Sequence, residues 1–311
     1  MSKRRPRAGA GRSGRGPGDR VAPGARSLTD YVYLVPALVL VVGLIYFSIG
    51  YTAWLSTQDW NGFSPNRVGV GVANYRAALE DHVFWRSLVN VVGFIVLGLV
   101  QMLTGLALAL LLHGQVRLGL VYRVCFFLPV VIAPAAIAPI YRELLSPSGQ
   151  INTLMEHIGL GALSHAWLAD PKTAIYALGA IGFCSGAGFC FVLYYAALTQ
   201  LDTEMLEAAR VDGAGNVRTF VSIIVPALRA THLTLIILIT IFTIKVFDLP
   251  QIITSGGPAN STQFPATHIY QAGVTDYEAG YGAALTVVLV VLCTTVAGWQ
   301  LWLARRSESE A

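Results

Sequence analysis

Four acidic residues stand close together in a chain that is otherwise poor in charge: Asp202, Glu204, Glu207 and Asp212. Only 12% of all residues are charged, whereas an ordinary soluble domain has about 25%. Such carboxylates can cap a helix, stabilise its positive end, or pair with an arginine a turn away. They are costly in the hydrocarbon of a bilayer. The stretch is therefore expected to lie outside the membrane that its apolar neighbours indicate.

A second pair of ionisable residues, Lys245 and Asp248, lies within an apolar segment. Ionisable residues inside a membrane span are functional candidates because of their cost. Being three positions apart, the two are expected on one helix face, and two interpretations remain open. They form an ion pair near the interface, with the lysine snorkelling, or they line a solute pathway. In a pathway, the lysine could bond hydroxyl groups or attract an anionic group.

No catalytic constellation accompanies these residues. The six histidines are scattered, and the four cysteines lie in apolar runs without metal-site spacing. The phosphate-binding pattern G-x-x-x-x-G-K-[ST] is absent, so ATP is not expected to bind in that way. The sequence thus predicts neither an enzyme nor a bound metal or cofactor. There is also no basic stripe with interleaved aromatic residues, which disfavours a nucleic-acid partner.

Composition instead indicates a multi-pass membrane protein, since 55% of the residues are hydrophobic. Residues 1–27 are rich in Gly, Arg and Pro and are expected to form a disordered basic tail. A membrane domain is expected over residues 28–311. A span needs about 20 apolar residues, and six segments qualify: 31–55, 87–112, 121–141, 174–198, 230–250 and 282–304. The third contains Pro129, Pro134 and Pro139, which membrane helices can tolerate.

The distribution of basic residues predicts the orientation. With the N-terminus inside, fifteen Lys and Arg residues fall on the cytoplasmic side and five on the outside. This bias places both termini and the acidic stretch in the cytoplasm. Small residues four apart, Gly105 with Ala109 and Gly182 with Gly186, predict close helix approach within the bundle or against a partner.

The acidic stretch reads as a helix, a glycine turn and a second helix. Asp202 or Thr203 can cap the first helix, and Gly213 and Gly215 allow a sharp turn before residues 216–226 lead back to the membrane. From periodicity alone, two interpretations are open: a solvated interfacial loop, or a docking helix whose apolar ridge lies in a groove of a cytoplasmic partner.

The spacing Glu-Ala-Ala, three residues, Gly, nine residues, Ile-x-Val-Pro resembles the EAA loop of ABC-importer permeases, with Val225 where that pattern has Leu. The resemblance implies that residues 201–226 form the coupling loop that docks on the ATP-hydrolysing subunit. The positions implied in this coupling are Glu207, Ala208, Ala209, Asp212, Gly213, Ile223 and Pro226.

Further segments narrow the family. "FFLPVVIAPAAIAPIYRELLSPSGQIN", "VFDLPQIITSGGPANST" and "DYEAGYGAALTVVL" resemble the MalF/UgpA-like sugar permeases, over about residues 28–304. The resemblance implies an all-α, six-span type I ABC-importer permease fold in a bacterial inner membrane. It implies import of a mono- or oligosaccharide, a sugar phosphate or glycerol phosphate by alternating access. The implied partners are a second homologous permease, an ATPase dimer that uses the ATP, and an extracellular or periplasmic solute-binding protein.

In that family the fifth span carries sugar contacts, so the pathway candidates are Lys245, Val246, Phe247 and Asp248, with Tyr194 as a further aromatic candidate. For Tyr194 and Phe247, apolar packing is the simpler explanation. A different class, an ion-coupled secondary transporter or channel, remains as an alternative. It would normally place charges or broken helices deep in several spans, often in repeated halves, and no internal repeat is present.

Overall fold

The computed structural model describes residues 33–113 and 119–309. The predicted basic tail, residues 1–27, lies outside the described residues. The chain forms two compact units, one ending at Gly50 and one beginning at Tyr51. The first unit contains α2 (Val35–Leu40), the π-helix η1 (Val41–Tyr46) and the start of α3 (Phe47–Leu55). Together these helices form an apolar run of 21 residues, Val35–Leu55, which is long enough to cross a bilayer.

The second unit is almost entirely helical. A two-stranded antiparallel ribbon, β1 (Gln58–Asp59) with β2 (Val68–Gly69), precedes the helices, and Gln58 pairs with Gly69. The helices follow in chain order: α4 (Ala73–Glu80), α5 (His82–His113), α6 (Gly119–Val131), α7 (Pro134–Leu144), α8 (Gln150–His157), η2 (Gly161–Leu163), α9 (Ala174–Leu198), α10 (Thr203–Val211), α11 (Asn216–Thr219), η3 (Phe220–Ile224), α12 (Val225–Ala227), α13 (Arg229–Ile244), α14 (Asp248–Ile253), α15 (Pro265–Tyr270), η4 (Gln271–Thr275) and α16 (Ala279–Ser309).

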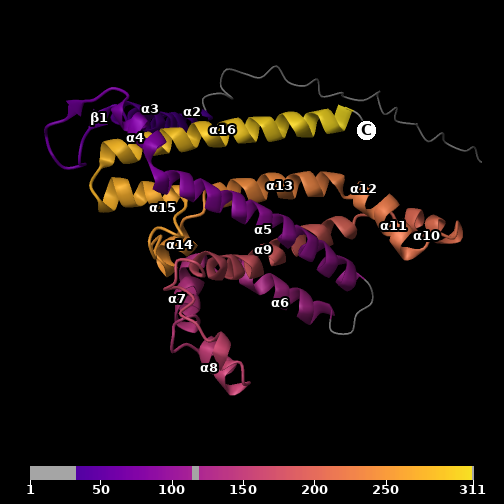
Figure 1. Cartoon of the computed structure of the whole chain (residues 1–311). Helices are drawn as coiled ribbons and strands as arrows, with labels where there is room; N and C mark the ends of the chain where they lie inside the picture. Colours follow the sequence, from indigo (N-terminus) through magenta and orange to yellow (C-terminus); the bar gives the residue numbers. More distant parts are fainter. Residues whose placement is uncertain (1–32, 114–118, 310–311) are drawn as a thin grey trace, which may run out of the picture. The chain divides into compact units, whose positions relative to one another are not determined.

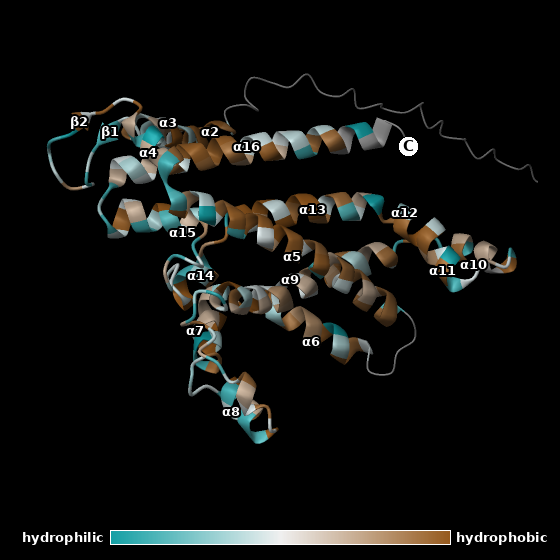
Figure 2. Ribbon diagram, in the orientation of Figure 1, coloured by the Kyte–Doolittle hydropathy of each residue, from teal (hydrophilic) through white to brown (hydrophobic). Residues whose placement is uncertain are grey.

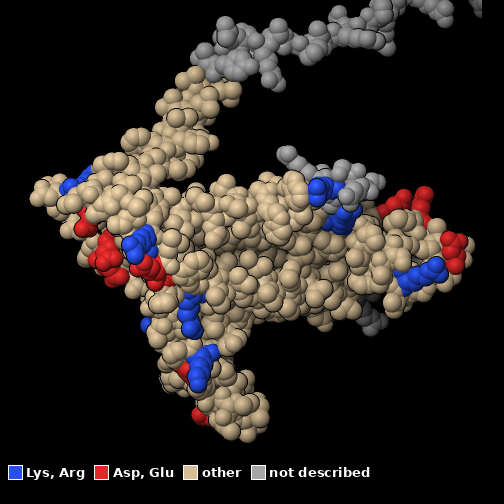
Figure 3. All heavy atoms as spheres, turned by 45° about the horizontal axis from the view of Figure 1, so that its top comes forward, with Lys and Arg blue, Asp and Glu red and all other residues tan. Residues whose placement is uncertain are grey.

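The described residues contain five helices that are long and apolar enough to cross a membrane, or six if one bent pair counts as a span. This confirms an all-α membrane fold with spans close to those predicted from the sequence. Hydrophobic residues predominate in α5, α9 and α13, whereas α8 and α10 mix hydrophilic and hydrophobic residues (Figure 2). On the face shown in Figure 3, the charged side chains of the second unit lie toward its ends, and a broad surface without charged residues lies between them.

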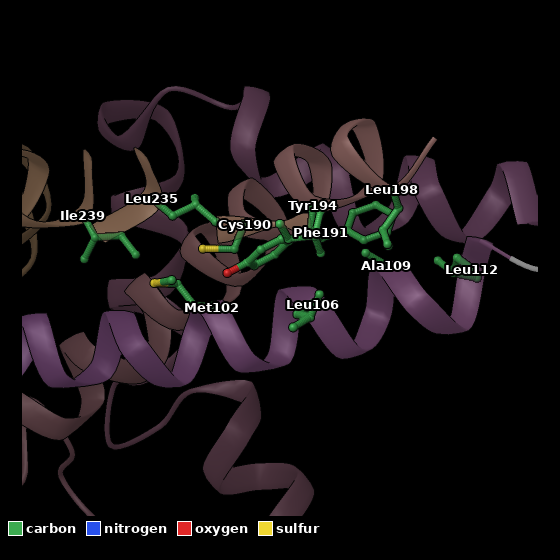
Figure 4. Packing of buried hydrophobic residues seen from close by; sticks show 11 residues of the cluster. Met102, Leu106, Ala109, Leu112, Cys190, Phe191, Tyr194, Leu198, Leu235 and Ile239 are labelled. Atoms are coloured by element: carbon green, nitrogen blue, oxygen red, sulfur yellow. The ribbon is translucent and has the colours of Figure 1, made fainter. Parts of the chain in front are cut away.

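The longest helix, α5, packs along α9, and α13 lies against both (Figure 1). Buried side chains of α5 and α9 interdigitate at this contact (Figure 4). A Cβ atom at Gly105 would lie 2.6 Å from the Cβ of Cys190, and one at Gly186 would lie 2.4 Å from the Gln101 amide. The predicted close approach of small residues is therefore confirmed, and at both positions it lies within the bundle.

The third span differs from the prediction of one continuous helix over residues 121–141. It breaks between α6 and α7, whose axes differ by 99°. Pro134 begins α7, and Ala133 before it is extended, with ψ of 134°. The proline ring disfavours helical geometry in the preceding residue and cannot donate to the carbonyl of Val130. Pro129 and Pro139 lie inside helices and do not produce this break.

The fifth span is interrupted as well. Helix α13 ends at Ile244, and α14 begins at Asp248 after a non-helical turn in which Phe247 has φ of −136° and ψ of −57°. Pro250 lies in the first turn of α14 and cannot donate to the carbonyl of Val246, four residues earlier. This break differs from the one in the third span, because Leu249, the residue before the proline, is helical and the non-helical turn lies at residues 245–247.

Asp81 ties three segments of the second unit together. One carboxylate oxygen accepts hydrogen bonds from the backbone N–H groups of Val83, at 2.7 Å, and Phe84, at 3.3 Å, which caps α5. The other accepts from His268 Nε2 on α15, at 2.7 Å, and from the Tyr281 hydroxyl on α16, at 2.6 Å. Burial opposes ionisation of Asp81, but the hydrogen bonds from Tyr281, His268 and Val83 outweigh it and hold its pKa below the usual value.

Replacing Asp81 with asparagine is expected to lower the thermal stability of the chain at neutral pH, because His268 and Tyr281 lose a buried, charged acceptor. The expected loss is about 1–3 kcal/mol. Since the folded-state pKa of Asp81 is depressed, its stabilisation is present above the unfolded pKa of about 3.9 and is lost as the pH falls through the folded value. Unfolding followed by intrinsic fluorescence in detergent at several pH values measures this.

The matched control for that experiment is Asp59→Asn, since Asp59 is exposed on β1. Its melting temperature should follow that of the unsubstituted chain. The interpretation of Asp81 fails if both variants melt alike at pH 7, or if the deficit of Asp81→Asn persists unchanged below the pH at which the carboxyl protonates.

Candidate functional site

The acidic stretch forms a capped helix followed by a left-handed glycine. The Asp202 carboxylate accepts a hydrogen bond from the Glu204 N–H at 2.9 Å, so Asp202 acts as the cap of α10. At the other end, Gly213 has φ of 77°, and the Ala214 N–H reaches back to the Ala209 carbonyl at 2.9 Å. The predicted helix, glycine turn and second helix are confirmed. Glu207 and Ala208 are exposed, whereas Ala209 is buried.

The second half of the loop is anchored to the bundle. Phe220 and Ile224 pack against the buried cluster of α5 and α9, and Leu228, 1% exposed, joins α12 to α13. Four apolar side chains remain exposed on the loop: Met205, Val211, Val217 and Val221. The apolar residues of the first helix are divided: Leu201, just before α10, packs against the α5–α9 cluster, whereas Met205 is exposed. The loop is therefore attached to the spans through Phe220, Ile224 and Leu228, and it leaves apolar side chains exposed elsewhere.

A central cavity of about 520 Å³ lies where the two broken spans meet α5 and α9. Val130 and Val246, the residues four before Pro134 and Pro250, are both on its wall. A proline at each break removes the intrahelical donor of a backbone carbonyl at these positions. The lining residues are Phe94, Gln101, Val130, Pro134, Leu178, Gly182, Ser185, Gly186, Phe189, Ile239, Phe242, Thr243, Val246, Leu249, Pro250 and Phe264.

Most of this wall is apolar or aromatic, and its side-chain polar groups are few. The Gln101 amide donates to the Gly182 carbonyl at 3.1 Å, and the Ser185 hydroxyl donates to the Pro129 carbonyl at 3.4 Å. Thr243 supplies a further hydroxyl. No Asp, Glu, Lys or Arg is among the described residues on the wall. A cavity of this kind, apolar with a few polar groups to fix orientation, suits an uncharged polar molecule.

The five residues predicted for the pathway do not come together. Val246 lines the central cavity. Lys245 instead lines a separate cavity of about 90 Å³ between α13 and α16, beside Gln300. Phe247 packs edge-on against Tyr270, with ring centroids 5.4 Å apart, and lines a groove of about 470 Å³.

The expectation that Lys245 and Asp248 share one helix face is wrong, because the break at residues 245–247 separates them. No ion pair joins these two residues, both of which are described and exposed. Tyr194 is 1% exposed in the α5–α9 cluster, and its hydroxyl shares a hydrogen bond of 2.6 Å with His232 Nδ1. Its position is that of a packing residue in this conformation.

Sequence reasoning missed Gln101, Ser185 and Thr243. The signal was present for Gln101, which is a lone amide in the middle of a long apolar run. Among the residues that the structure describes, no three His, Cys, Asp or Glu side chains are grouped to hold a metal ion.

Comparisons with known proteins agree over nearly the whole chain. Residues 9–309 match the family model described as binding-protein-dependent transport system inner membrane component. A probable ABC transporter permease protein, YurN of Bacillus subtilis, is 31% identical over 287 residues, covering 91% of this chain and 98% of the relative. The permease NgcF of the diacetylchitobiose uptake system of Streptomyces coelicolor is 30% identical over 271 residues, covering 83% and 76%.

A solved structure gives the same result for the fold. A chain of a bacterial ABC transporter involved in the import of the acidic polysaccharide alginate superposes with a TM-score of 0.76. The match covers 89% of this chain and 95% of that one, at 20% sequence identity. At this identity the likeness shows a common fold.

Proposed function

Because this chain belongs to the family of binding-protein-dependent transport system inner membrane components, we propose that it is a permease subunit of an ATP-driven importer for a carbohydrate. The observation that carries the proposal is the central cavity without charged lining residues, which lies at the bend between α6 and α7 and at the turn between α13 and α14. In this proposal a second, homologous permease completes the pathway. A pair of ATPase subunits supplies the energy from separate chains, and a solute-binding protein delivers the substrate from outside.

The chemistry of the cavity supports a neutral sugar over a phosphorylated one. Sugars combine many hydroxyl groups with apolar ring faces. Phe94, Phe189, Phe242 and Phe264 offer aromatic surface, and Gln101 offers an amide that can exchange hydrogen bonds with hydroxyls. An anionic phosphate would need a cation, and no Lys or Arg is among the described residues on this wall. Relatives are named for both classes, NgcF for diacetylchitobiose uptake and UgpA for sn-glycerol-3-phosphate transport, so the preference for a neutral sugar rests on the cavity.

The proposed orientation places α10 to α12 in the cytoplasm, as the fifteen-to-five bias of basic residues favours. From there the loop has a direct mechanical path to the cavity. Leu228 connects α12 to α13 without an intervening loop, and α13 carries Ile239, Phe242 and Thr243 on the cavity wall. A shift of the loop on ATPase closure would therefore move one wall of the cavity, which is what alternating access requires.

One feature also fits the alternative of an ion-coupled secondary transporter: the broken helices at the cavity, because such helices surround the midplane site in that class as well. Reconstituted vesicles separate the two. We expect uptake of radiolabelled sugars to require this chain, its partner permease, the ATPase, the binding protein and ATP. Uptake driven by a proton or sodium gradient without the ATPase would contradict the proposal.

A further inference from the structure

The segment between α14 and α15, residues 254–264, is irregular in backbone yet deeply packed. Ser261, Thr262, Gln263 and Phe264 are each at most 1% exposed. Three of these four carry polar side chains. Irregular backbone at membrane depth persists only where protein covers it or where it lines a cavity, because its polar groups have no water to bond.

Most of its polar groups are satisfied close by in the sequence. The Thr262 hydroxyl lies 2.6 Å from the Gly257 carbonyl and 2.8 Å from the Thr254 hydroxyl. The Gln263 side-chain carbonyl accepts from the Thr267 hydroxyl at 2.6 Å, and its amide donates to Gln271. These bonds hold the segment together as a unit, but they do not attach that unit to the long helices.

The attachment comes from α5. The side-chain amide of Asn90 donates to the carbonyl of Ser261 at 3.0 Å and to that of Gln263 at 2.8 Å. One NH2 group thus uses both of its protons on two carbonyls of the same segment. One turn further along α5, Phe94 packs edge-on against Phe264, with ring centroids 4.9 Å apart. Residues four apart share a helix face, so the same face of α5 holds both the backbone and the ring of this segment.

Phe264 and Phe94 both line the central cavity. They lie on its side nearest the start of α5, whereas Gln101 lies about two turns further along that helix. The position of the Phe264 ring is thus fixed by its own packing and by the backbone that Asn90 holds. Loss of the two amide hydrogen bonds would release the backbone on which the ring is mounted.

We propose that Asn90 is a positioning residue: by holding the carbonyls of Ser261 and Gln263 it keeps the Phe264 ring in the wall of the central cavity and so keeps the cavity closed at that end. Asparagine meets a specific requirement here, since two carbonyls two positions apart need two donors from one neutral group. Aspartate has the same shape but offers only acceptors when ionised, and would repel both carbonyls. The inference concerns the wall of the cavity and does not depend on which solute passes through it.

The test is the accessibility of a thiol placed inside the cavity. Thr243→Cys puts a thiol of similar size on the cavity wall. Cells that produce the complete importer are treated from outside with a membrane-impermeant, sulfonated methanethiosulfonate. Modification at position 243 is measured by site-resolved mass spectrometry, so the four native cysteines can remain. Adding Asn90→Asp is expected to raise the labelling rate by about tenfold, as the loss of two hydrogen bonds predicts.

The chain provides a matched control. Asn74 also donates its side-chain amide to two backbone carbonyls, those of Ser56 and Gln58, both at 2.9 Å, but it is not among the residues that line the cavity. Asn74→Asp with Thr243→Cys should label at the original rate. If Asn90→Asp does not accumulate in the membrane, Asn90→Ala removes the same donors without adding a charge and should give the same increase.

Two results would overturn the proposal. One is a labelling rate within about twofold of the original in the Asn90 variants. The other is an equal increase in the Asn74 control, which would mean that general loosening exposes the thiol. Since labelling requires neither ATP nor uptake, the outcome is independent of whether the chain imports a sugar. Failure of ATP-driven uptake in the vesicle experiment would leave the labelling result standing.

Discussion

Replacing Glu207 with lysine is expected to reduce ATP-driven uptake by at least about tenfold while the chain remains folded in the membrane. Glu207 is exposed on α10, so reversing its charge should change the free energy of unfolding by no more than about 0.5 kcal/mol. A charge reversal at the centre of a docking surface costs far more, because like charges meet or a buried charge loses its partner. The loss should therefore appear in the association with the ATPase.

The measurement is co-purification of the ATPase with the tagged permease, together with uptake and ATP hydrolysis in vesicles. Glu156→Lys is the matched control, since Glu156 is an acid on another short helix, α8, where the proposed function places no ATPase contact. We expect the control to keep the ATPase bound and the uptake intact. If Glu207→Lys copurifies with the ATPase and transports at the original rate, α10 is a solvated loop and not the coupling element.

The loop could be predicted because its signal is local. The cap at Asp202, the left-handed glycine at position 213 and the spacing to Pro226 each depend on a few neighbouring residues. The spans could be predicted for an equally simple reason, since the thickness of the bilayer sets the length of each apolar run. Neither the loop nor the spans require knowledge of which helices pack against each other.

The breaks in the third and fifth spans could not be predicted with the same certainty. The third span contains three prolines at five-residue spacing, and only Pro134 coincides with the bend. What distinguishes it is tertiary packing, because α7 after the bend packs against α14 and α9 through Ala138, Ile253 and Leu178. That contact stabilises the turned helix and joins residues that are more than a hundred positions apart in the sequence.

The residues that line the cavity were harder still to predict, because the charged residues of the fifth span do not line it. Lys245 and Asp248 are conspicuous in an apolar run, yet the central cavity is lined by uncharged side chains from several helices. Only Val246 of the predicted pathway residues lies on it. Gln101 was the better signal, because a neutral amide inside a span also needs partners and attracts less notice than a lysine.

The adjacent residues Lys245 and Val246 therefore provide the sharpest test of the pathway. Replacing Val246 with tryptophan is expected to lower uptake by at least about tenfold, because the indole would fill part of the cavity of about 520 Å³ that we propose as the solute pathway. The empty space should limit the cost of the larger side chain to less than the roughly 1–3 kcal/mol typical of overpacking. Expression, binding of the ATPase and basal ATP hydrolysis should persist, so the defect should appear in transport alone.

Two comparisons make that result specific. Val290→Trp adds the same side chain on α16, where Val290 is 45% exposed and is not among the residues that line the cavity, and should transport normally. Lys245→Ala changes the neighbouring residue, whose side chain faces the small cavity beside Gln300. If uptake falls in Lys245→Ala and not in Val246→Trp, the solute passes between α13 and α16. If it falls only in Val246→Trp, the pathway lies at the two helix breaks. The turn at residues 245–247 then directs Val246 into the pathway while Lys245 faces the small cavity beside Gln300.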